Sequence, residues 1–356
     1  MSLNPKSYDR LTINGQRMEK DELLEKASSV IQNQETPEWE VDMFRFVNEW
    51  LQPDEFMEVT TSGSTGNPKT LRIPKKAMLQ SAFTTNHFFA LNENHTALLC
   101  LSCKYIAGKM MVVRALSAGF NLITVPVSGH PLEQVNQEID FAAMTPLQMS
   151  NELQKAKDRP FLPHTIILGG SRVSRELSRP LKHFPAQIWE TYGMTETLSH
   201  IALRPVNGPH ASDFFQPLPN VQISVDSHDC LVINVPGITD GALSTNDIAE
   251  LQKDGSFRIK GRRDHVINTG GIKVIPEEIE KELASLLRGA FYIAAAPHPV
   301  LGQQLVLITE EKIPNKKYLL KKLKQLLPPY HAPRQIIEKE RLPRTETGKI
   351  IRSSHQ

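Results

Sequence analysis

Residues 60–69 have the composition of a phosphate-binding loop. They read Thr-Thr-Ser-Gly-Ser-Thr-Gly-Asn-Pro-Lys, so hydroxyl side chains surround two glycines and a lysine closes the segment. The glycines allow backbone conformations that other residues avoid, and successive N–H groups can then point at one anion. The lysine adds a positive charge. We therefore expect phosphate contacts from Thr61, Ser62, Gly63, Ser64, Thr65, Gly66 and Lys69.

Two other interpretations of this segment fit less well. The P-loop of nucleoside triphosphatases needs a second glycine directly before its lysine. Pro68 occupies that position, and proline has neither a backbone N–H nor the required freedom in φ. A flexible Ser/Gly-rich surface loop fits the composition but does not account for the Gly-Asn-Pro-Lys ending.

A carboxylate follows a short strand that we expect at residues 187–189. The chain continues Tyr192-Gly193-Met194-Thr195-Glu196. Magnesium in proteins prefers one or two carboxylates together with phosphate oxygens and water. Glu196 at the end of a strand can therefore hold Mg²⁺ beside a triphosphate. Taken alone, the same residues could also cap a helix.

These segments and three others occur in the order found in the adenylate-forming superfamily, which the chain resembles. That superfamily comprises acyl-CoA synthetases, peptide-synthetase adenylation domains and luciferases. The resemblance covers residues 60–349 and includes Gly261-Arg262-Arg263-Asp264 and a basic segment ending in Thr347-Gly348-Lys349. Any one segment can arise by chance, whereas five in the same order indicate the family.

The resemblance implies roles for individual residues of an ATP site. Lys349 is expected to bridge the attacking carboxylate and the α-phosphate, where charge develops in the transition state. Glu196 is expected to hold magnesium, Thr195 to contact the α-phosphate and Tyr192 to stack on adenine. Further ATP contacts are implied for Gly169, Gly170, Ser171, Thr191, Gly193, Asp247 and Arg262, with Asp247 and Arg262 near the ribose.

The resemblance also implies a second half-reaction with coenzyme A. Asp264 is expected to be the hinge about which a small C-terminal domain turns, and Gly270 and Gly271 are expected to line the pantetheine channel. Two departures accompany this pattern. Asn246 replaces the glycine that usually precedes the ribose aspartate, and relatives carry a longer stretch before the phosphate loop, so we expect a shortened N-terminus.

Several residues are candidates for the acyl pocket. Tyr105 lies where many relatives have an aromatic residue or a histidine, and the surrounding sequence resembles most the o-succinylbenzoate–CoA ligases of menaquinone biosynthesis. That acid carries a second carboxylate, which needs a cationic or hydrogen-bonding partner when buried. Arg114 and Lys109 are candidates, although an arginine in an apolar run can also snorkel from a helix. The acyl-pocket candidates are Tyr105, Lys109, Arg114, Ser199 and His200.

The elements that must position these residues alternate between strands and helices. Apolar side chains at helical spacing predict helices at residues 21–31 and 39–51 before the first motif. Short buried strands are expected at residues 97–101, 121–125, 165–168 and 187–189, with helical stretches between them. After Pro205 short strands with turns are expected at 221–225, 231–235, 249–251 and 257–260. From Asp264 a strand, a helix at 276–287, strands at 291–296 and 304–309, and a helix at 316–327 follow.

This pattern predicts an α/β fold with two domains. We expect residues 1–263 to form a large ATP- and acyl-binding domain of stacked α/β sheets with a β-rich subdomain. We expect residues 264–356 to form a small, mobile α+β domain. The 356 residues, with 40% hydrophobic and 22% charged side chains, have ample apolar material for both cores.

The composition limits where in the cell the protein is expected and what kinds of partner it is expected to bind. The N-terminus lacks the apolar segment of a secretory signal, no run is long enough to cross a bilayer, and three cysteines are too few for a disulfide scaffold. These features predict a cytoplasmic protein. Residues 312–352 carry 12 Lys and Arg against 3 Asp and Glu. Most of these lysines fit the solvated face of an amphipathic helix, so we expect neither nucleic acid nor membrane as partner, and a homodimer remains open.

The sequence thus predicts an enzyme that uses ATP and Mg²⁺ to form an acyl-adenylate and then an acyl-CoA. Alternatives stay open. The acid could be another aryl or acyl acid, the acceptor could be a carrier protein, or the chain could be a non-catalytic nucleotide-binding protein. The presence of both Glu196 and Lys349 argues against the last.

Overall fold

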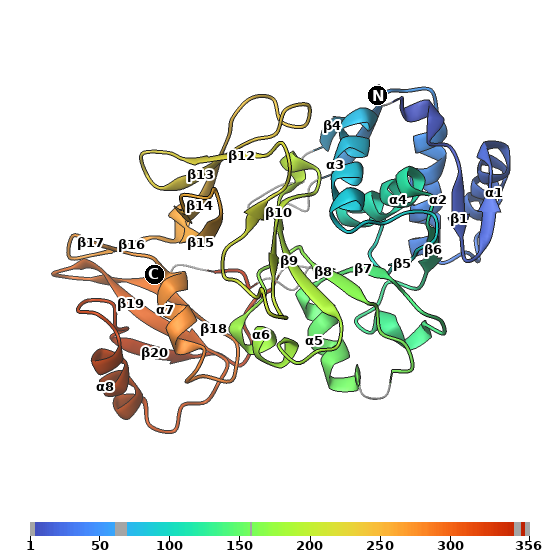
Figure 1. Ribbon diagram of the computed structural model, residues 1–356. Coiled ribbons are helices and arrows are strands. Elements are labelled where there is room, and N and C mark those ends of the chain that lie inside the picture. The colour runs from blue at the N-terminus through green and yellow to red at the C-terminus, as the bar shows by residue number, and fades with distance from the viewer. Residues whose placement is uncertain (1–3, 61–69, 157–158, 345–349, 353–356) are drawn as a thin grey trace. The chain divides into compact units, whose positions relative to one another are not determined.

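The computed structural model describes residues 4–60, 70–156, 159–344 and 350–352 (Figure 1). The chain divides into two compact units. The first comprises Met1–Gln222 and Asn234–Ala242, and the second comprises Ile223–Ile233 and Leu243–Gln356. The predicted hinge at Asp264 lies inside the second unit by this division, so the domain boundary at residue 263 stays a prediction.

A nine-stranded sheet forms the centre of the first unit, in the order β11-β10-β9-β8-β7-β5-β6-β1-β2. The strands from β9 to β1 in this order are mutually parallel, whereas β2, β10 and β11 pair antiparallel. Their bounds are β1 Leu11–Ile13, β2 Gln16–Met18, β5 Thr96–Leu99, β6 Asn121–Thr124, β7 Phe141–Met144, β8 Thr165–Leu168, β9 Gln187–Gly193, β10 His200–Pro205 and β11 Gln216–Pro217. The carboxyl ends of the parallel strands therefore lie along one edge, where ligands bind in open α/β sheets.

Helices cover both faces of this sheet. One apolar cluster joins the sheet to α1 Lys20–Gln32, α2 Glu38–Leu51, α3 Lys75–Phe88 and α4 Ile106–Ala118. Another joins it to α5 Pro146–Lys155 and α6 Arg175–Leu181. Successive strand residues alternate between the two clusters: Ile167 belongs to the first, and its neighbours Ile166 and Leu168 belong to the second. Strands covered on both faces read as continuous apolar runs, which made β5, β6 and β8 recognisable in the sequence.

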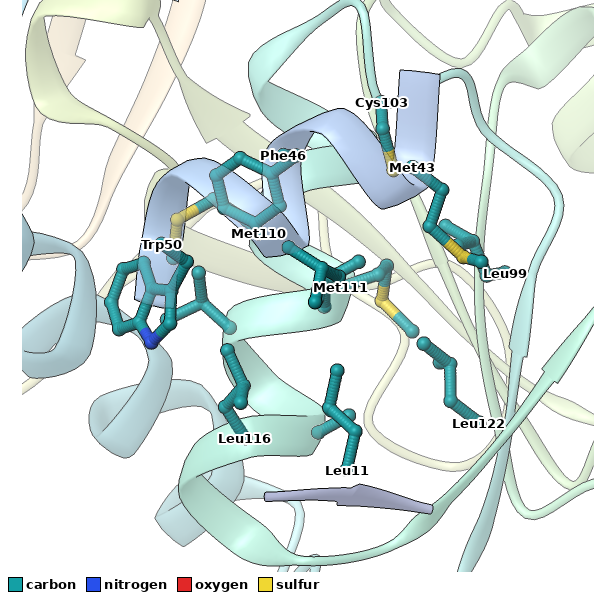
Figure 2. Packing of buried hydrophobic residues seen from close by; sticks show 14 of the residues in the cluster. Leu11, Met43, Phe46, Trp50, Leu99, Cys103, Met110, Met111, Leu116 and Leu122 are labelled. Carbon is teal, nitrogen blue, oxygen red and sulfur yellow. The ribbon is translucent and has the colours of Figure 1, made fainter. Parts of the chain in front are cut away.

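Helix α4 is central to the first cluster. Figure 2 shows Met110, Met111 and Leu116 of α4 among side chains from α2, including Phe46 and Trp50, and from strands β1, β5 and β6. The helix ends at Gly119, whose φ of 79° gives the left-handed conformation that closes many helices. This packing fixes the rotation of α4 about its axis and therefore the face on which Arg114 lies.

A two-stranded hairpin, β3 Phe56–Thr60 with β4 Thr70–Pro74, stands apart from the large sheet. Thr60 pairs with Thr70, so the two ends of the predicted phosphate loop are held side by side. Helix α3 begins directly afterwards at Lys75, as expected from a helix start near Pro74.

The second unit contains two sheets. An antiparallel sheet has the order β12-β13-β14-β15, with bounds Gln222–Val225, Cys230–Asn234, Leu243–Leu251 and Phe257–Arg262. The other has the order β17-β16-β19-β18, with β20 beside β19; the bounds are β16 Ile267–Thr269, β17 Ile272–Val274, β18 Phe291–His298, β19 Gly302–Thr309 and β20 Gln335–Glu338. Helices α7 Pro276–Leu283 and α8 Lys316–Leu326 pack on it.

The fold class is as predicted, with differences in detail. Helix α7 ends at Leu283 rather than at residue 287, because Leu287 reaches the core from a turn after the helix. The strand expected at 187–189 extends to Gly193. Strand β7 lies in a stretch that the sequence predicted as helical. No helix in the described part of the chain is long and apolar enough to span a membrane.

Candidate active site

The carboxyl ends of β8 and β9 bring two groups of predicted ATP-site residues together. These strands are parallel neighbours, so residues 169–171 and 191–193 lie at the same edge of the sheet. The Thr191 hydroxyl donates a hydrogen bond to the carbonyl oxygen of Leu168, directly before Gly169, at 3.0 Å. The adenine-side segment and the strand that carries Tyr192 are therefore joined by a side chain as well as by the sheet.

A buried ion pair, which the sequence prediction missed, stabilises the same edge of the large sheet. Glu190 is 3% exposed and pairs with Arg204 of the antiparallel neighbour β10. Its other carboxylate oxygen accepts the backbone N–H of Val173, at 2.9 Å, in the segment that follows Ser171. Burial raises the pKa of Glu190 above its ordinary value, although the positive charge of Arg204 opposes this. No local sequence pattern signals this pair, because its members meet only where β9 and β10 lie side by side.

The chain then turns sharply between β9 and β10, which directs Glu196 and His200 to opposite environments. Leu198 has a φ of 64° and a ψ of −41°, and the Ser199 N–H donates to the Thr197 carbonyl oxygen at 2.7 Å. This is a γ-turn with positive φ at a leucine, a rare and strained conformation. Such strain persists where the surrounding structure requires it, commonly at functional sites. Glu196 is exposed on one side of the turn, whereas His200 is buried on the other.

Gly193 has a packing reason of its own. It pairs with His200 across the β9–β10 ladder. A Cβ at this position would collide with the Ser199 carbonyl oxygen and lie 2.6 Å from the His200 Cα. The glycine therefore lets the strained turn fold back against its own strand.

Arg114, Ser199 and His200 meet in a chain of polar contacts below this turn. The guanidinium donates to the Ser199 hydroxyl at 2.8 Å and to the Met111 sulfur at 3.4 Å. Ser199 lies 3.3 Å from Nδ1 of His200, and Nε2 of His200 lies 3.3 Å from the hydroxyl of Thr85. Three of the five acyl-pocket candidates are thus brought together from α4 and β10, 85 residues apart in sequence.

The electrostatics of this group are unusual because a buried cation lacks a counter-charge among the described residues. Arg114 is 2% exposed, and its Nε has no hydrogen-bond partner in that part of the chain. No carboxylate of the described residues forms a salt bridge with it, and burial lowers the pKa of the guanidinium to about 10. The pKa of His200 lies well below its ordinary value, first through burial and then through the charge of Arg114, so His200 is neutral near pH 7. The group offers one uncompensated positive charge.

A small cavity of about 20 Å³ borders this polar chain. His200, Ser81 and Thr84 line its polar side, and Leu218 and Ile238 line its apolar side. Its size corresponds to about one water molecule. An aryl acid can enter here only if neighbouring side chains move.

Lys109 and Tyr105 lie elsewhere on α4. The ammonium of Lys109 donates to the Glu58 carbonyl oxygen at 3.3 Å and sits 5.7 Å from the centre of the Phe46 ring. It thus faces α2 and β3, not the polar chain. Tyr105 occupies the position just before α4, with extended backbone.

The order of the strands in the large sheet changes direction between β5 and β7. At this place the side-chain amide of Gln148 donates hydrogen bonds to the carbonyl oxygens of Cys100 and Ser128.

The second unit holds the remaining described candidates. Asp247 of β14 and Arg262 of β15 are direct cross-strand partners, and a guanidinium nitrogen lies 3.5 Å from the Asp247 carboxylate. Arg262 also donates twice to Asp264, at 3.0 and 3.1 Å. The hydroxyl of Thr245 accepts the Asp247 N–H at 3.1 Å, which supports the strand despite Asn246.

Gly270 and Gly271 form the two-residue turn between β16 and β17. Their φ values are 60° and 87°, as a tight hairpin turn of this kind requires. Structure alone therefore accounts for both glycines, and the predicted pantetheine channel stays a prediction. The phosphate-loop candidates Thr61 to Lys69 and the catalytic candidate Lys349, expected to bridge the substrate carboxylate and the α-phosphate, lie outside the described residues.

Comparison with known proteins decides the family. The model of the AMP-binding enzyme family matches residues 5–238. This chain belongs to the AMP-binding enzyme family. Its members bind adenine nucleotides, which agrees with the motif order and with the position of Glu196 and residues 191–193 at the strand ends.

Individual relatives agree with this assignment. A solved acyl-CoA synthetase (AMP-forming)/AMP-acid ligase II-like protein from Dyadobacter fermentans is 31% identical, covers 91% of this chain and 95% of its own, and superposes with a TM-score of 0.61. The 2-succinylbenzoate–CoA ligase of Staphylococcus aureus is 26% identical over 323 residues. That match covers 82% of this chain but only 65% of the relative.

A structure of similar fold shows an acyl-adenylate bound. The o-succinylbenzoate CoA synthetase from Bacillus subtilis, solved with its acyl-adenylate intermediate, is 17% identical and superposes with a TM-score of 0.74 over 96% of this chain and 94% of its own. At this identity the likeness establishes the fold. The resemblance predicted from the motifs is confirmed by the family match.

Proposed function

We propose that this chain joins a carboxylic acid to coenzyme A at the expense of ATP, and that the acid is o-succinylbenzoate. Membership of the AMP-binding enzyme family supports nucleotide use. The name of the Staphylococcus aureus relative supports the acid and the acceptor. The observation on this chain that carries the substrate assignment is the buried Arg114, which has no carboxylate partner among the residues that the structure describes.

In the first half-reaction the carboxylate of the acid attacks the α-phosphorus of ATP. A bond forms between a carboxylate oxygen and that phosphorus, and the bond to the β-phosphate oxygen breaks, so pyrophosphate leaves. Residues 61–69 and Lys349 neutralise and orient the phosphates, which is the main source of rate in phosphoryl-type transfers. Arg262, already aligned by Asp247 and Asp264, holds the ribose end.

Glu196 fits a magnesium site. It is exposed at the end of β9, and a single carboxylate is what magnesium bound mainly to phosphate oxygens and water requires. The described residues contain no group of three or more carboxylate, histidine or cysteine ligands, which also fits a metal that arrives with its nucleotide. Bound there, Mg²⁺ would neutralise charge on the phosphates.

In the second half-reaction the thiol of coenzyme A attacks the acyl carbonyl. A carbon–sulfur bond forms, the carbon–oxygen bond to the phosphate breaks, AMP leaves, and the thiol proton passes to solvent. We propose that residues 264–356 turn about Asp264 between the half-reactions, and that Gly270 and Gly271 then line the pantetheine path. Such a motion needs only a few residues with large backbone changes.

Arg114 supplies the specificity. The acid has one carboxylate that reacts and one that does not, and the second must be paired if it is buried. The guanidinium can offer its unpaired Nε–H to that carboxylate while Ser199 and the neutral His200 remain hydrogen-bonded beside it. A charge-assisted pair of this kind is stronger than a neutral hydrogen bond.

The test is a product assay with two acids. The enzyme, Mg·ATP and coenzyme A are incubated with o-succinylbenzoate or with benzoylpropanoate, the same acid without the ring carboxylate, and AMP and acyl-CoA are measured. We expect both products with o-succinylbenzoate and little with its analogue. Equal rates with both acids would contradict the role of Arg114. Pyrophosphate release with o-succinylbenzoate but no formation of acyl-CoA would instead favour a carrier protein as acceptor.

A further inference from the structure

The two ends of the segment that carries Lys349 are fixed to the second unit. Arg344 and Ile350 form an isolated antiparallel β-bridge, and the Ile351 N–H donates to the Pro343 carbonyl oxygen at 2.8 Å. Leu342, 1% exposed, packs in a cluster with Tyr292 and other residues of β18 and β19, and Ile350 packs against the same cluster. Residues 343–344 and 350–351 therefore lie against each other on this sheet, and Ile350 directly follows Lys349 in sequence.

An arginine just after this point anchors the chain by charge. Arg352 binds both carboxylate oxygens of Glu280, with distances of 2.8 and 2.6 Å, and lies over the Tyr292 ring at 5.9 Å. Glu280 also accepts the backbone N–H of Ile293 at 2.8 Å. This two-pronged geometry is specific to a guanidinium, because an ammonium cannot make two parallel bonds to one carboxylate.

The same arginine reaches the segment that contains the predicted hinge. Arg352 lies 3.7 Å from the carboxylate of Glu277, which is hydrogen-bonded to Nδ1 of His265 at 2.5 Å. His265 directly follows Asp264 within the short helical turn Arg263–His265. One continuous polar network therefore joins residue 265, the first turns of α7 and the chain end beyond Lys349.

The charged side chains of this network are largely shielded from water, which strengthens their interaction with one another. The side chains of Arg352, Glu280 and Glu277 are 23%, 15% and 12% exposed. Two carboxylates face one guanidinium, with His265 as the second donor. Breaking one member of such a buried group leaves an unpaired charge, so the members act together.

We propose that Arg352 is a positioning residue for adenylate formation: through Glu280 and Glu277 it holds the chain beside Lys349 in a fixed relation to the hinge segment. This inference rests on the proposed function, because it takes Lys349 as the residue that acts on the α-phosphate. Arg352 itself touches neither reactant. Its removal should therefore impair the half-reaction that uses Lys349 and spare the one that does not.

The experiment measures the two half-reactions separately. ATP–pyrophosphate exchange with o-succinylbenzoate reports the first. Conversion of the chemically prepared acyl-adenylate to acyl-CoA reports the second. The variants are R352K, which keeps the charge but not the paired geometry, and the double variant R352Q/E280Q, which removes both charges of the paired bond, leaves Glu277 its hydrogen bond to His265, and so guards against simple unfolding. R341Q, at an exposed arginine of the same segment, is the control.

We expect the double variant to lose exchange on the order of 10²-fold, as displacements of about 1 Å at a reacting group do, while thioester formation stays within about threefold of wild type. R352K should fall between, and R341Q should match wild type. Equal losses in both half-reactions would mean a merely structural role, and unchanged exchange would also overturn the proposal. No exchange in the wild-type protein would overturn the proposed function itself, and this inference with it.

Discussion

We predict that the buried Arg114 lowers the stability of the folded protein and is retained because it binds the substrate. We expect the substitution Arg114→Met to stabilise the folded chain. A guanidinium whose pKa falls from 12.5 to about 10 has lost roughly 3 kcal/mol of favourable interaction relative to water. Methionine removes that penalty, has Met111 as a neighbour, and adapts its shape readily.

Part of this gain is offset by contacts that the arginine makes. The substitution removes the hydrogen bond to Ser199, worth about 1 kcal/mol. Ser199 keeps a partner in His200, so no buried hydroxyl is left alone. The expected net effect is a gain of about 2 kcal/mol in the free energy of unfolding. The pKa of His200 should also rise toward its ordinary value, because one of the two causes of its depression is gone.

The assay combines stability and function in one variant. Urea unfolding gives the free-energy difference, and the product assay compares o-succinylbenzoate with benzoylpropanoate. Arg114→Met should raise stability and abolish the preference for the diacid, chiefly through a higher KM. Arg114→Lys is the matched control, because it keeps a charge in the same place. If Arg114→Met were destabilised and kept its acid preference, the guanidinium would have a structural role and the account of the acyl pocket would be refuted.

Three further outcomes follow from described contacts. The ammonium of Lys75 donates hydrogen bonds to the carbonyl oxygens of Glu49, Trp50 and Gln52 at the end of α2. The substitution Lys75→Met should therefore lower the free energy of unfolding in urea by about 3 kcal/mol. Lys76→Met, at an exposed neighbouring position, should change it little. Gly193→Ala should lower the rate of adenylate formation at least tenfold and the free energy of unfolding by about 2 kcal/mol, because the new Cβ would collide with the Ser199 carbonyl oxygen. An unchanged rate of ATP–pyrophosphate exchange would refute the role of the tight turn. Burial opposes ionisation of Glu277, but His265 and Arg352 outweigh it and hold its pKa below its ordinary value. The stabilisation is then full above about pH 5 and lost as the pH falls through the folded-state pKa, so wild type and Glu277→Gln should differ near neutral pH and converge in acid; a constant difference would contradict this.

The elements that the sequence predicted well are those with a single clear signal. Strand β8 has the predicted bounds, because three consecutive apolar residues, Ile166–Leu168, follow Thr165 and end at a glycine pair. Helix α8 ends within one residue of its predicted end, since its leucines recur at helical spacing. Strand β7 was missed because Phe-Ala-Ala-Met has no alternation and modest strand propensity. The β1–β2 hairpin was missed although Asn14-Gly15 is a strong turn signal, and both residues do have positive φ.

The motifs name candidate site residues, whose roles stay predictions, but they do not reveal how those residues are arranged. Motif order placed Tyr192, Thr195 and Glu196 near a strand end, and the structure agrees. The contact of Arg114 with Ser199 joins residues far apart in the chain, so no local pattern could reveal it. The same is true of the pair of Glu190 with Arg204. The strain at Leu198 depends on the backbone path between two antiparallel strands, which leucine itself does not signal.

The most direct test of the central claim is ATP–pyrophosphate exchange by the purified wild-type chain with o-succinylbenzoate, alongside Lys349→Ala. We predict exchange that requires both Mg²⁺ and the acid and that falls by about two orders of magnitude or more in the variant, as expected when charge stabilisation in the transition state is removed. Folded wild-type protein that shows no exchange with this acid or any acid of a broad panel would contradict adenylate formation.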